Sequence, residues 1–182
     1  MSFETCRLPG VVIVRPRVFP DARGFFKEIS RRDLYAANGI DRDFVQVNMS
    51  QSRRDVLRGL HYQLKFPQAK LVSVAHGRIY DVVVDCRRGS SAFGQWIGIE
   101  LSAEGGEELF VPEGFAHGFH VLSETASVVY QCSDYYHPGD EYGLNWASKR
   151  LGIDWAVKTP VLSGKDAALP MFEDVAESDL PA

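Results

Sequence analysis

Residues 57–63 read Leu57-Arg58-Gly59-Leu60-His61-Tyr62-Gln63, a segment with strand character in which a histidine follows an arginine and a glycine. Under strict alternation, the face that carries the histidine consists of Leu57, Gly59, His61 and Gln63. An imidazole with an ordinary pKa near ~6.5 suits proton transfer at neutral pH, although a lone strand histidine more often has a structural role. Alternation sends Arg58 to the opposite face. Both side chains serve one site only if Gly59 carries a bulge, or if Arg58 lies at a barrel mouth or reaches a partner's site.

Short runs rich in β-branched and aromatic residues surround this segment, separated by glycine and proline turns. They predict strands at 11–14, 25–29, 44–50, 56–63, 71–75, 79–85, 95–101, 108–111, 118–122 and 127–135. In the run 95–101, Ile97, Ile99 and Leu101 are expected on one face. The triplet His76-Gly77-Arg78 is interpreted as a tight hairpin.

Only one helix is expected before residue 140. Ser30 resembles an N-cap, Asp33 lies three residues on as in a capping box, and Gly39 ends the segment. Short strands with regular turns predict a mainly β sandwich or small barrel with a few short helices. The length favours one domain, 1–182, with a core at about 9–137 and a proline-containing segment, 138–182, that wraps the outside.

Composition narrows the possible functions. Hydrophobic residues make up 45% of the chain, enough for a full core, and the net charge of −4 comes without a basic block, which argues against nucleic-acid binding. There is no apolar run of 18 residues and no signal-like start, so no membrane contact is expected. Cys6, Cys86 and Cys132 form no Cys-x-x-Cys pair, which favours free thiols in a reducing cytoplasm.

A second histidine follows a proline–glycine turn. Pro112-Glu113-Gly114-Phe115-Ala116-His117 resembles the second half of the cupin signature, whose first half carries His-x-His and a glutamate. Here the first half is His61-Tyr62-Gln63, which leaves two histidines where a catalytic metal usually has three protein ligands. The pattern therefore favours a cupin-like barrel without a metal.

Other side chains have both a structural and a functional interpretation. Tyr130 shares a face with Val128 and Cys132, and is either a core aromatic or a proton donor across a pocket. Four basic residues stand beside glycine turns or apolar segments; each alone fits a solvated surface charge, but together they could hold an anionic ligand: Arg23, Arg58, Lys70 and Lys165.

Several blocks, taken in order, are similar to the dTDP-4-dehydrorhamnose 3,5-epimerase family. They are Arg23-Gly24-Phe25-Phe26, Gln46-x-Asn48-x-Ser50, the segment 57–63, Gln68-Ala69-Lys70-Leu71-Val72, Phe93-Gly94-Gln95-Trp96, Pro112-Glu113-Gly114-Phe115-Ala116-His117-Gly118-Phe119 and Leu162-Ser163-Gly164-Lys165-Asp166. No single block is specific, but together they cover roughly residues 9 to 172 and are highly specific.

The resemblance implies a cupin-like jelly-roll barrel that forms a homodimer and needs no cofactor. It also implies inversion of C3 and C5 of dTDP-4-dehydro-6-deoxy-D-glucose, giving dTDP-4-dehydro-L-rhamnose on the route to dTDP-L-rhamnose. It implies that His61 is the base, oriented by Asp166, that Tyr130 is the acid on the opposite face of the sugar, and that Lys70 lies near the C4 oxygen. The residues that it places along the nucleotide-sugar site are Arg23, Phe26, Glu28, Gln46, Asn48, Arg58, His117, Glu141 and Lys165.

Three alternatives remain open at this point. A relative that inverts only C3 or only C5 would use the same base and acid. A metal-dependent cupin would need ligands that the first histidine segment lacks, and a non-catalytic sugar-binding barrel would need no acid–base set. The sequence also leaves open whether Arg23 and Phe26 serve their own pocket or that of a partner.

Overall fold

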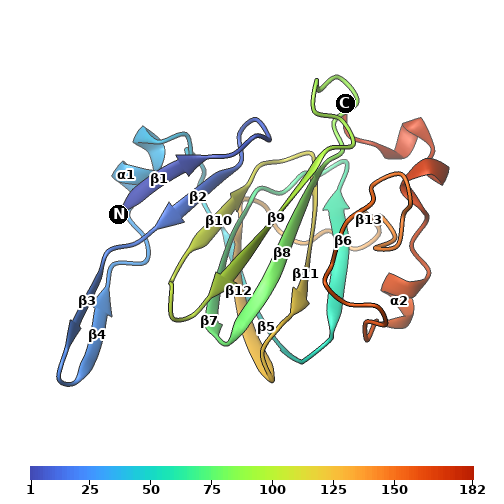
Figure 1. The fold of residues 1–182 in the computed structure, drawn as a ribbon. Helices are drawn as coiled ribbons and strands as arrows, with labels where there is room; N and C mark the ends of the chain where they lie inside the picture. Colours follow the sequence, from blue (N-terminus) through green and yellow to red (C-terminus); the bar gives the residue numbers. More distant parts are fainter.

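The computed structural model describes residues 1–182, and most of the chain forms two antiparallel sheets that face each other as a barrel (Figure 1). The six-stranded sheet runs in the order β1 (Ser2–Thr5), β2 (Val12–Arg15), β10 (Glu108–Val111), β7 (Lys70–His76), β12 (Thr125–Cys132) and β5 (Gln46–Arg53). The five-stranded sheet runs in the order β13 (Glu141–Gly143), β6 (Leu57–Gln63), β11 (Phe115–Val121), β8 (Arg78–Asp85) and β9 (Trp96–Ser102). The prediction of a mainly β jelly-roll fold is confirmed.

The main core fills the space between the two sheets. Alternate residues of facing strands meet there, because strand side chains point to opposite faces in turn. Leu101 is fully buried in this core, and Ile97 and Ile99 pack against it, as the alternation in β9 predicts.

A second apolar cluster lies on the outer face of the five-stranded sheet, under the C-terminal part of the chain. Leu57, Leu60 and Tyr62 of β6 pack there against residues such as Trp155 and Phe172. This covering segment contains α2 (Gly164–Ala167) and two 3₁₀ turns, Phe172–Asp174 and Glu177–Asp179. One strand, β13, lies beyond the last predicted strand and pairs with β6. It has only three residues, too few to show an alternation in the sequence.

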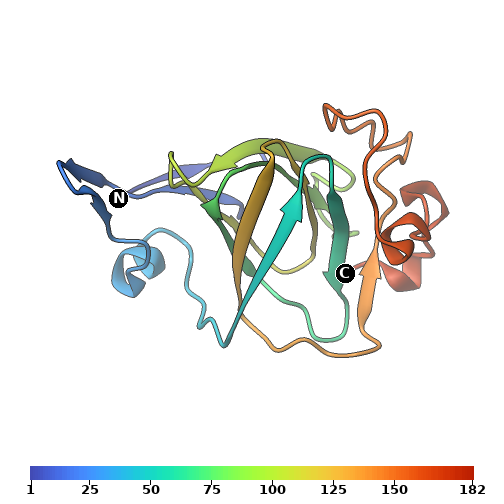
Figure 2. The ribbon, with the colours of Figure 1, turned by 90° about the horizontal axis from the view of Figure 1, so that it is seen from below.

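A hairpin formed by β3 (Val18–Asp21) and β4 (Gly24–Lys27) projects away from the barrel, as both views show (Figures 1 and 2). We call residues 18–27 the arm. Its aromatic side chains Phe19, Phe25 and Phe26 are exposed by 45%, 61% and 69%. Strand β3 is absent from the sequence prediction, because Pro20 disfavours a strand.

Helix α1 (Arg32–Ala37) follows the arm, and its N-cap is Arg31 rather than the predicted Ser30. The expected capping box does not form. Asp33 instead accepts hydrogen bonds from the Arg31 guanidinium, at 2.9 Å to Nε and 3.0 Å to Nη2. None of the helices has the length and apolar character that crossing a membrane would require.

The hairpin predicted at residues 76–78 is also wrong. Strands β7 and β8 belong to different sheets, so Gly77 marks a corner where the chain crosses the barrel. Gly77 has a φ of 78°, and a Cβ there would lie 2.1 Å from the carbonyl oxygen of Thr125. A glycine between two apolar strands fits a hairpin and a crossing between sheets equally well. The two differ only in which distant strands each of the two strands pairs with, and the local sequence does not show this.

Candidate active site

Strand β6 contains an extra residue at the point where it carries its histidine. His61 pairs with His117 and Arg58 pairs with Phe119, so Gly59 and Leu60 together face a single residue of β11. Gly59 has a φ of 103°, and a Cβ on it would lie 2.6 Å from the His117 carbonyl oxygen. The position therefore requires glycine.

This bulge changes the faces that strict alternation predicts. Arg58 and His61 both line the same pocket, whereas Leu57 packs in the outer cluster. The expectation that Leu57 shares a face with His61 is wrong, because the extra residue shifts the pattern by one. The bulge at Gly59 that a shared site requires is present.

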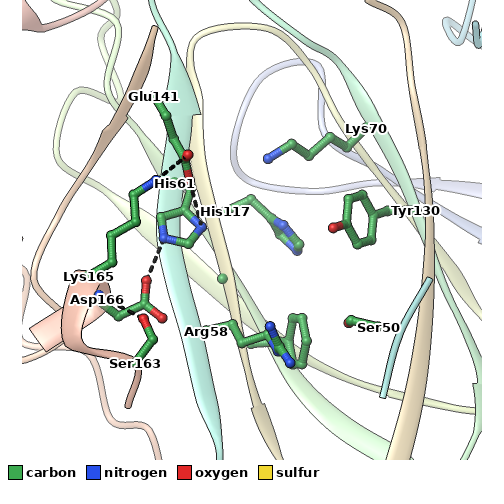
Figure 3. Close-up of a pocket in the computed structure, with 12 residues that line it drawn as sticks. Ser50, Arg58, His61, Lys70, His117, Tyr130, Glu141, Ser163, Lys165 and Asp166 are labelled. Carbon is green, nitrogen blue, oxygen red and sulfur yellow. Dashed lines mark hydrogen bonds and ion pairs between the residues drawn. The ribbon is translucent and has the colours of Figure 1, made fainter. Parts of the chain in front are cut away.

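The pocket opens between the sheets and has a volume of about 310 Å³ (Figure 3). It is lined by Ser50, Arg58, His61, Lys70, His117, Gly118, Phe119, Tyr130, Glu141, Ser163, Lys165 and Asp166. An adjoining hollow shares His61, Lys70, Tyr130 and Glu141 and adds further polar residues, among them Gln46, Asn48 and Tyr136. Ten of the thirteen predicted site residues thus converge, from strands of both sheets and from the C-terminal segment.

His61 is held by a carboxylate from a distant part of the chain. Its Nε2 lies 2.6 Å from Oδ1 of Asp166, which is 4% exposed. Burial raises the pKa of Asp166, but the hydrogen bonds from His61 and Ser163 outweigh it and leave the pKa below its usual value. An ionised carboxylate only accepts, so Nε2 carries the hydrogen and, in the neutral ring, Nδ1 carries the lone pair. The arrangement gives His61 the tautomer of a base.

Asp166 is placed by the short helix α2. Ser163 is the N-cap of α2, and its hydroxyl oxygen accepts a hydrogen bond of 3.0 Å from the Asp166 backbone N–H. Sequence reasoning does not single out Ser163 by itself. The spacing Ser163-x-x-Asp166 is nevertheless the signal of a capping box and could have identified it.

A second carboxylate lies near the other nitrogen of the His61 ring. Oε1 of Glu141 is 3.9 Å from Nδ1, too far for a hydrogen bond. Glu141 forms an ion pair with Lys165 and accepts a 3.1 Å hydrogen bond from the Tyr136 hydroxyl. Burial raises the pKa of Glu141, but Lys165 and His61 outweigh that effect and lower it overall. Glu141 is therefore an anion beside His61.

Tyr130 reaches into the pocket from β12, on the wall opposite His61 (Figure 3). Its hydroxyl group faces the cavity and makes no hydrogen bond to any other group of the chain, so it is available to a bound molecule. Burial raises the pKa of Tyr130, which keeps the phenol protonated at neutral pH. A protonated phenol therefore faces His61 across the pocket.

Lys70 and His117 lie between these two walls (Figure 3). Burial lowers the pKa of Lys70, while the negative charges of Glu141 and Asp81 partly oppose the shift. His117 shares an Nε2 hydrogen with Asp81, at 3.0 and 2.9 Å to its two carboxylate oxygens. Asp81 is fully buried, and burial raises its pKa although His117 and Lys70 act in the other direction.

Asp81 is a site residue that the sequence interpretation missed. It stands alone as an acid within the apolar run Ile79–Val84, and a lone charge in a buried strand is the signal that could have found it. His61 and His117 lie opposite each other, yet each ring is bound to its own carboxylate. No group of three or more His, Cys, Asp or Glu side chains is arranged to hold a metal ion.

Three predicted site residues lie outside the pocket. Arg23, Phe26 and Glu28 are on or beside the arm, and the Arg23 side chain is 90% exposed and paired with Asp21 at 2.6 Å. Within one chain the fold does not bring them to His61.

Comparison with known proteins agrees with this geometry. Residues 5–174 match the family model described as dTDP-4-dehydrorhamnose 3,5-epimerase. A dTDP-4-dehydrorhamnose 3,5-epimerase of Shigella flexneri is 46% identical over 96% of this chain and 97% of its own length. The enzyme of that name from Neisseria gonorrhoeae is 51% identical over 99% of this chain, which spans 55% of that longer protein.

A solved structure has the same fold over almost the whole chain. The dTDP-6-deoxy-D-glucose-3,5-epimerase of Legionella pneumophila, in complex with dTDP-4-keto-L-rhamnose, superposes with a TM-score of 0.95. It is 43% identical and covers 99% of this chain and 97% of its own. Because these matches extend over almost the whole chain, the chain belongs to the dTDP-4-dehydrorhamnose 3,5-epimerase family of isomerases.

Proposed function

We propose that this protein inverts C3 and C5 of dTDP-4-dehydro-6-deoxy-D-glucose to give dTDP-4-dehydro-L-rhamnose. One observation carries the proposal: the His61–Asp166 pair and the Tyr130 phenol occupy opposite walls of one pocket, with Lys70 and His117 between them. A base and an acid on opposite faces of a sugar ring are what inversion at a carbon requires.

The reaction follows from these positions. His61 removes a proton from the carbon next to the C4 ketone, and the electron pair of that C–H bond moves to the C4 oxygen as an enolate. Lys70 stabilises the developing oxyanion with its ammonium group. Tyr130 then delivers a proton to the same carbon from the opposite face, and the ketone re-forms. Asp166 stabilises the imidazolium in the interval. Exchange with solvent then removes the proton from His61 and returns one to Tyr130, so a second round can invert the other carbon.

The nucleotide end of the substrate has polar and cationic partners. Arg58 is directed into the pocket by a 2.9 Å hydrogen bond from its Nε to the Ser52 hydroxyl, and it is suited to bind an oxygen of the diphosphate. Gln46 and Asn48 line the adjoining hollow and are linked by a 3.0 Å hydrogen bond. These groups provide remote binding energy that holds the sugar against His61.

The arm supplies the missing part of the site if two copies of the chain associate. Strand β5 is an edge of the six-stranded sheet, and its outer side chains Val47 and Met49 are 63% and 70% exposed, while Gln46 and Asn48 of the same strand line the pocket. An open edge with apolar side chains is a surface for another strand. We place the arm of a second copy on this edge, where its residues Arg23, Phe26 and Glu28 would reach the pocket.

A cytoplasmic setting is part of the proposal. The three cysteines are free in the structure, as expected of a protein in a reducing compartment. Cell fractionation tests this point, and enzyme recovered only outside the cytoplasm would contradict it.

Proton NMR of the 4-keto sugar nucleotide with chelator-treated protein in deuterated water tests the reaction. Deuterium entry at both C3 and C5, followed by reduction to the L-rhamno product, is expected. Label at one carbon only would assign the chain to epimerases that act at a single carbon. No exchange at either carbon would overturn the proposed pairing of His61 with Tyr130.

Subunit complementation tests the shared site. Arg23→Ala and His61→Ala chains carrying different tags are co-expressed, and the mixed dimers are purified. If the arm acts on the partner, a mixed dimer has one complete site and regains about half of the activity, whereas each homodimer stays impaired. No recovery in the mixed dimer would place the arm's residues in their own chain's site.

A further inference from the structure

Tyr35 of α1 has a hydroxyl group that lies between two acceptors. Its oxygen is 2.8 Å from the backbone carbonyl oxygen of Ile29 and 2.5 Å from Oε2 of Glu108. Tyr35 is 3% exposed and Glu108, on β10, is also 3% exposed. The contacts thus connect the barrel wall, through Tyr35 of α1, to Ile29, which lies two residues after the arm.

Two hydrogen bonds at the Tyr35 oxygen need two hydrogens, and the phenol supplies only one of them. A phenol has a single hydrogen to donate, and neither a carbonyl nor a carboxylate has any. If Glu108 is ionised, only one contact is a hydrogen bond, and the other brings two oxygen atoms together without a hydrogen between them. If Glu108 is a neutral acid, its O–H donates to the Tyr35 oxygen and the Tyr35 O–H donates to the Ile29 carbonyl.

We propose that Glu108 is a neutral carboxylic acid in the folded protein and that its proton, through Tyr35, fastens the root of the arm to the barrel. Tyr35 and Glu108 are then positioning residues for Glu28, which precedes Ile29, and for the arm beyond it. We call the two hydrogen bonds that join Glu108, Tyr35 and Ile29 the latch. Its effect on catalysis rests on the proposed function, in which the arm completes the partner's site, but the existence of the latch does not.

The surroundings of Glu108 agree with a neutral acid. Tyr35 belongs to an apolar cluster with Val14 and Phe110, and the edge of its ring meets Phe3 with centroids 5.9 Å apart. Burial raises the pKa of Glu108 to about 7, although the hydrogen bond from Tyr35 and the charge of Lys27 act to lower it.

The other titratable groups that face the pair are few. Lys27 at the end of the arm acts on Glu108, and Glu28 acts on Tyr35. Burial and the nearby Glu108 raise the pKa of Tyr35, so the phenol stays protonated throughout the neutral range. The pH response of the latch therefore belongs to Glu108.

The sign of the response follows from the direction of that shift. The folded-state pKa of Glu108 lies above its ordinary value of 4.5, so the folded state holds the proton more tightly than the unfolded chain. The contribution of the latch to stability is complete below the ordinary value, falls as the pH rises, and is lost above about 7. Above that pH the Tyr35 hydroxyl turns to the carboxylate and releases the Ile29 carbonyl.

Infrared spectroscopy and hydrogen exchange of the intact protein test the proposal directly. We expect a protonated-carboxyl absorption band that disappears as the pH is raised from about 5.5 to about 8.5 and is missing in Glu108→Gln. Over the same range, after correction for intrinsic rates, amides at residues 28–32 should exchange about fivefold faster, the factor expected for the loss of one net hydrogen bond.

Two variants provide matched controls. The amide of Glu108→Gln can still donate to Tyr35 but does not titrate, so exchange at 28–32 should be slow and independent of pH. Tyr35→Phe removes the link, so exchange should be fast at every pH. An infrared spectrum of the wild-type protein without the protonated band at the lower pH would overturn the proposal, whatever the folding of the variants.

A kinetic measurement separates this latch from the shared site. If the arm serves the partner, the KM of the wild-type enzyme rises above neutral pH with little change in kcat, and Glu108→Gln removes that rise. A pH-dependent exchange at residues 28–32 with a constant KM would uphold the latch and count against the arm's role in the partner's pocket.

Discussion

His61 is oriented by the carboxylate of Asp166 and faces the hydroxyl group of Tyr130 across the pocket. Asp166 fixes the ring hydrogen on Nε2 through a 2.6 Å contact, which leaves Nδ1 to accept a proton. Tyr130 stands across the cavity as a protonated phenol. At the scale of single residues, the site thus places the His61 imidazole and the Tyr130 phenol on opposite walls of one pocket.

Substitution of the base should separate binding from turnover. His61→Ala is expected to bind dTDP as well as the wild-type protein does, because the partners of the nucleotide lie elsewhere, and to lose turnover by about 10²- to 10⁴-fold. Calorimetric titration with dTDP and steady-state kinetics measure the two effects. Normal epimerisation by this variant would show that His61 is not the base.

The alkaline limb of the pH profile should belong to Lys70. Burial lowers the pKa of Lys70 below its ordinary value of 10.5 and raises the pKa of Tyr130, so burial favours early loss of the Lys70 proton and opposes loss of the Tyr130 proton. We expect kcat, which the ionisation of Glu108 leaves almost unchanged, to fall on the alkaline side below pH 10.5, and this limb to move to higher pH in Lys70→Arg.

The matched variant for this assignment is Tyr130→Phe. It should lower the rate without moving the alkaline limb, because burial raises the pKa of the phenol and so opposes its ionisation. A limb that stays in place in Lys70→Arg and disappears in Tyr130→Phe would reverse the assignment.

At the scale of elements, the bulge in β6 brings Arg58 and His61 to one pocket. The close approach of Gly59 to His117 and Gly118 leaves no space for a side chain. Gly59→Ala combines a backbone conformation that favours glycine with a steric clash, and we expect it to lower the free energy of unfolding by about 2 to 4 kcal/mol. Urea denaturation measures this loss.

A second glycine serves as the control. Gly89 lies in a loop, and a Cβ added there meets no atom within 4 Å. Gly89→Ala should therefore leave the denaturation midpoint almost unchanged. Equal stability of the two alanine variants would contradict the steric account of the bulge.

At the scale of the whole molecule, the arm and the β5 edge leave apolar surface that a single chain does not cover. If a second copy covers it, the melting temperature should rise with protein concentration, because association stabilises only the folded state. The double variant Val47→Lys with Met49→Lys should dissociate into monomers in analytical ultracentrifugation.

Val161 supplies the comparison for that measurement. It is 57% exposed and belongs to the C-terminal segment, where it pairs with Val56 beyond the end of β5, so Val161→Lys should remain associated. A monomeric wild-type protein, or dissociation of all variants alike, would remove the basis for a site shared between two copies.

Local sequence determined the features that depend on nearest neighbours along the chain. The alternation of Ile97, Ile99 and Leu101 predicted a buried strand face, and residues 108–111 were predicted with the bounds that the structure has. Turn residues and β-branched runs were enough for a mainly β barrel, since these preferences arise within a few residues. The ordered family blocks carried the candidate site, including the pairing of His61 with Asp166 across 105 positions.

Tertiary structure decided what depends on contacts between distant segments. The face of Leu57 was predicted wrongly because the bulge at Gly59 is set by the approach of β11, and Gly77 proved to be a corner because β7 and β8 pair with different partners. The link of Asp81 to His117 and the two acceptors of Tyr35 likewise join strands and helices far apart in sequence. No local pattern encodes such contacts, because their energies come from burial and hydrogen bonds that exist only once the sheets have closed.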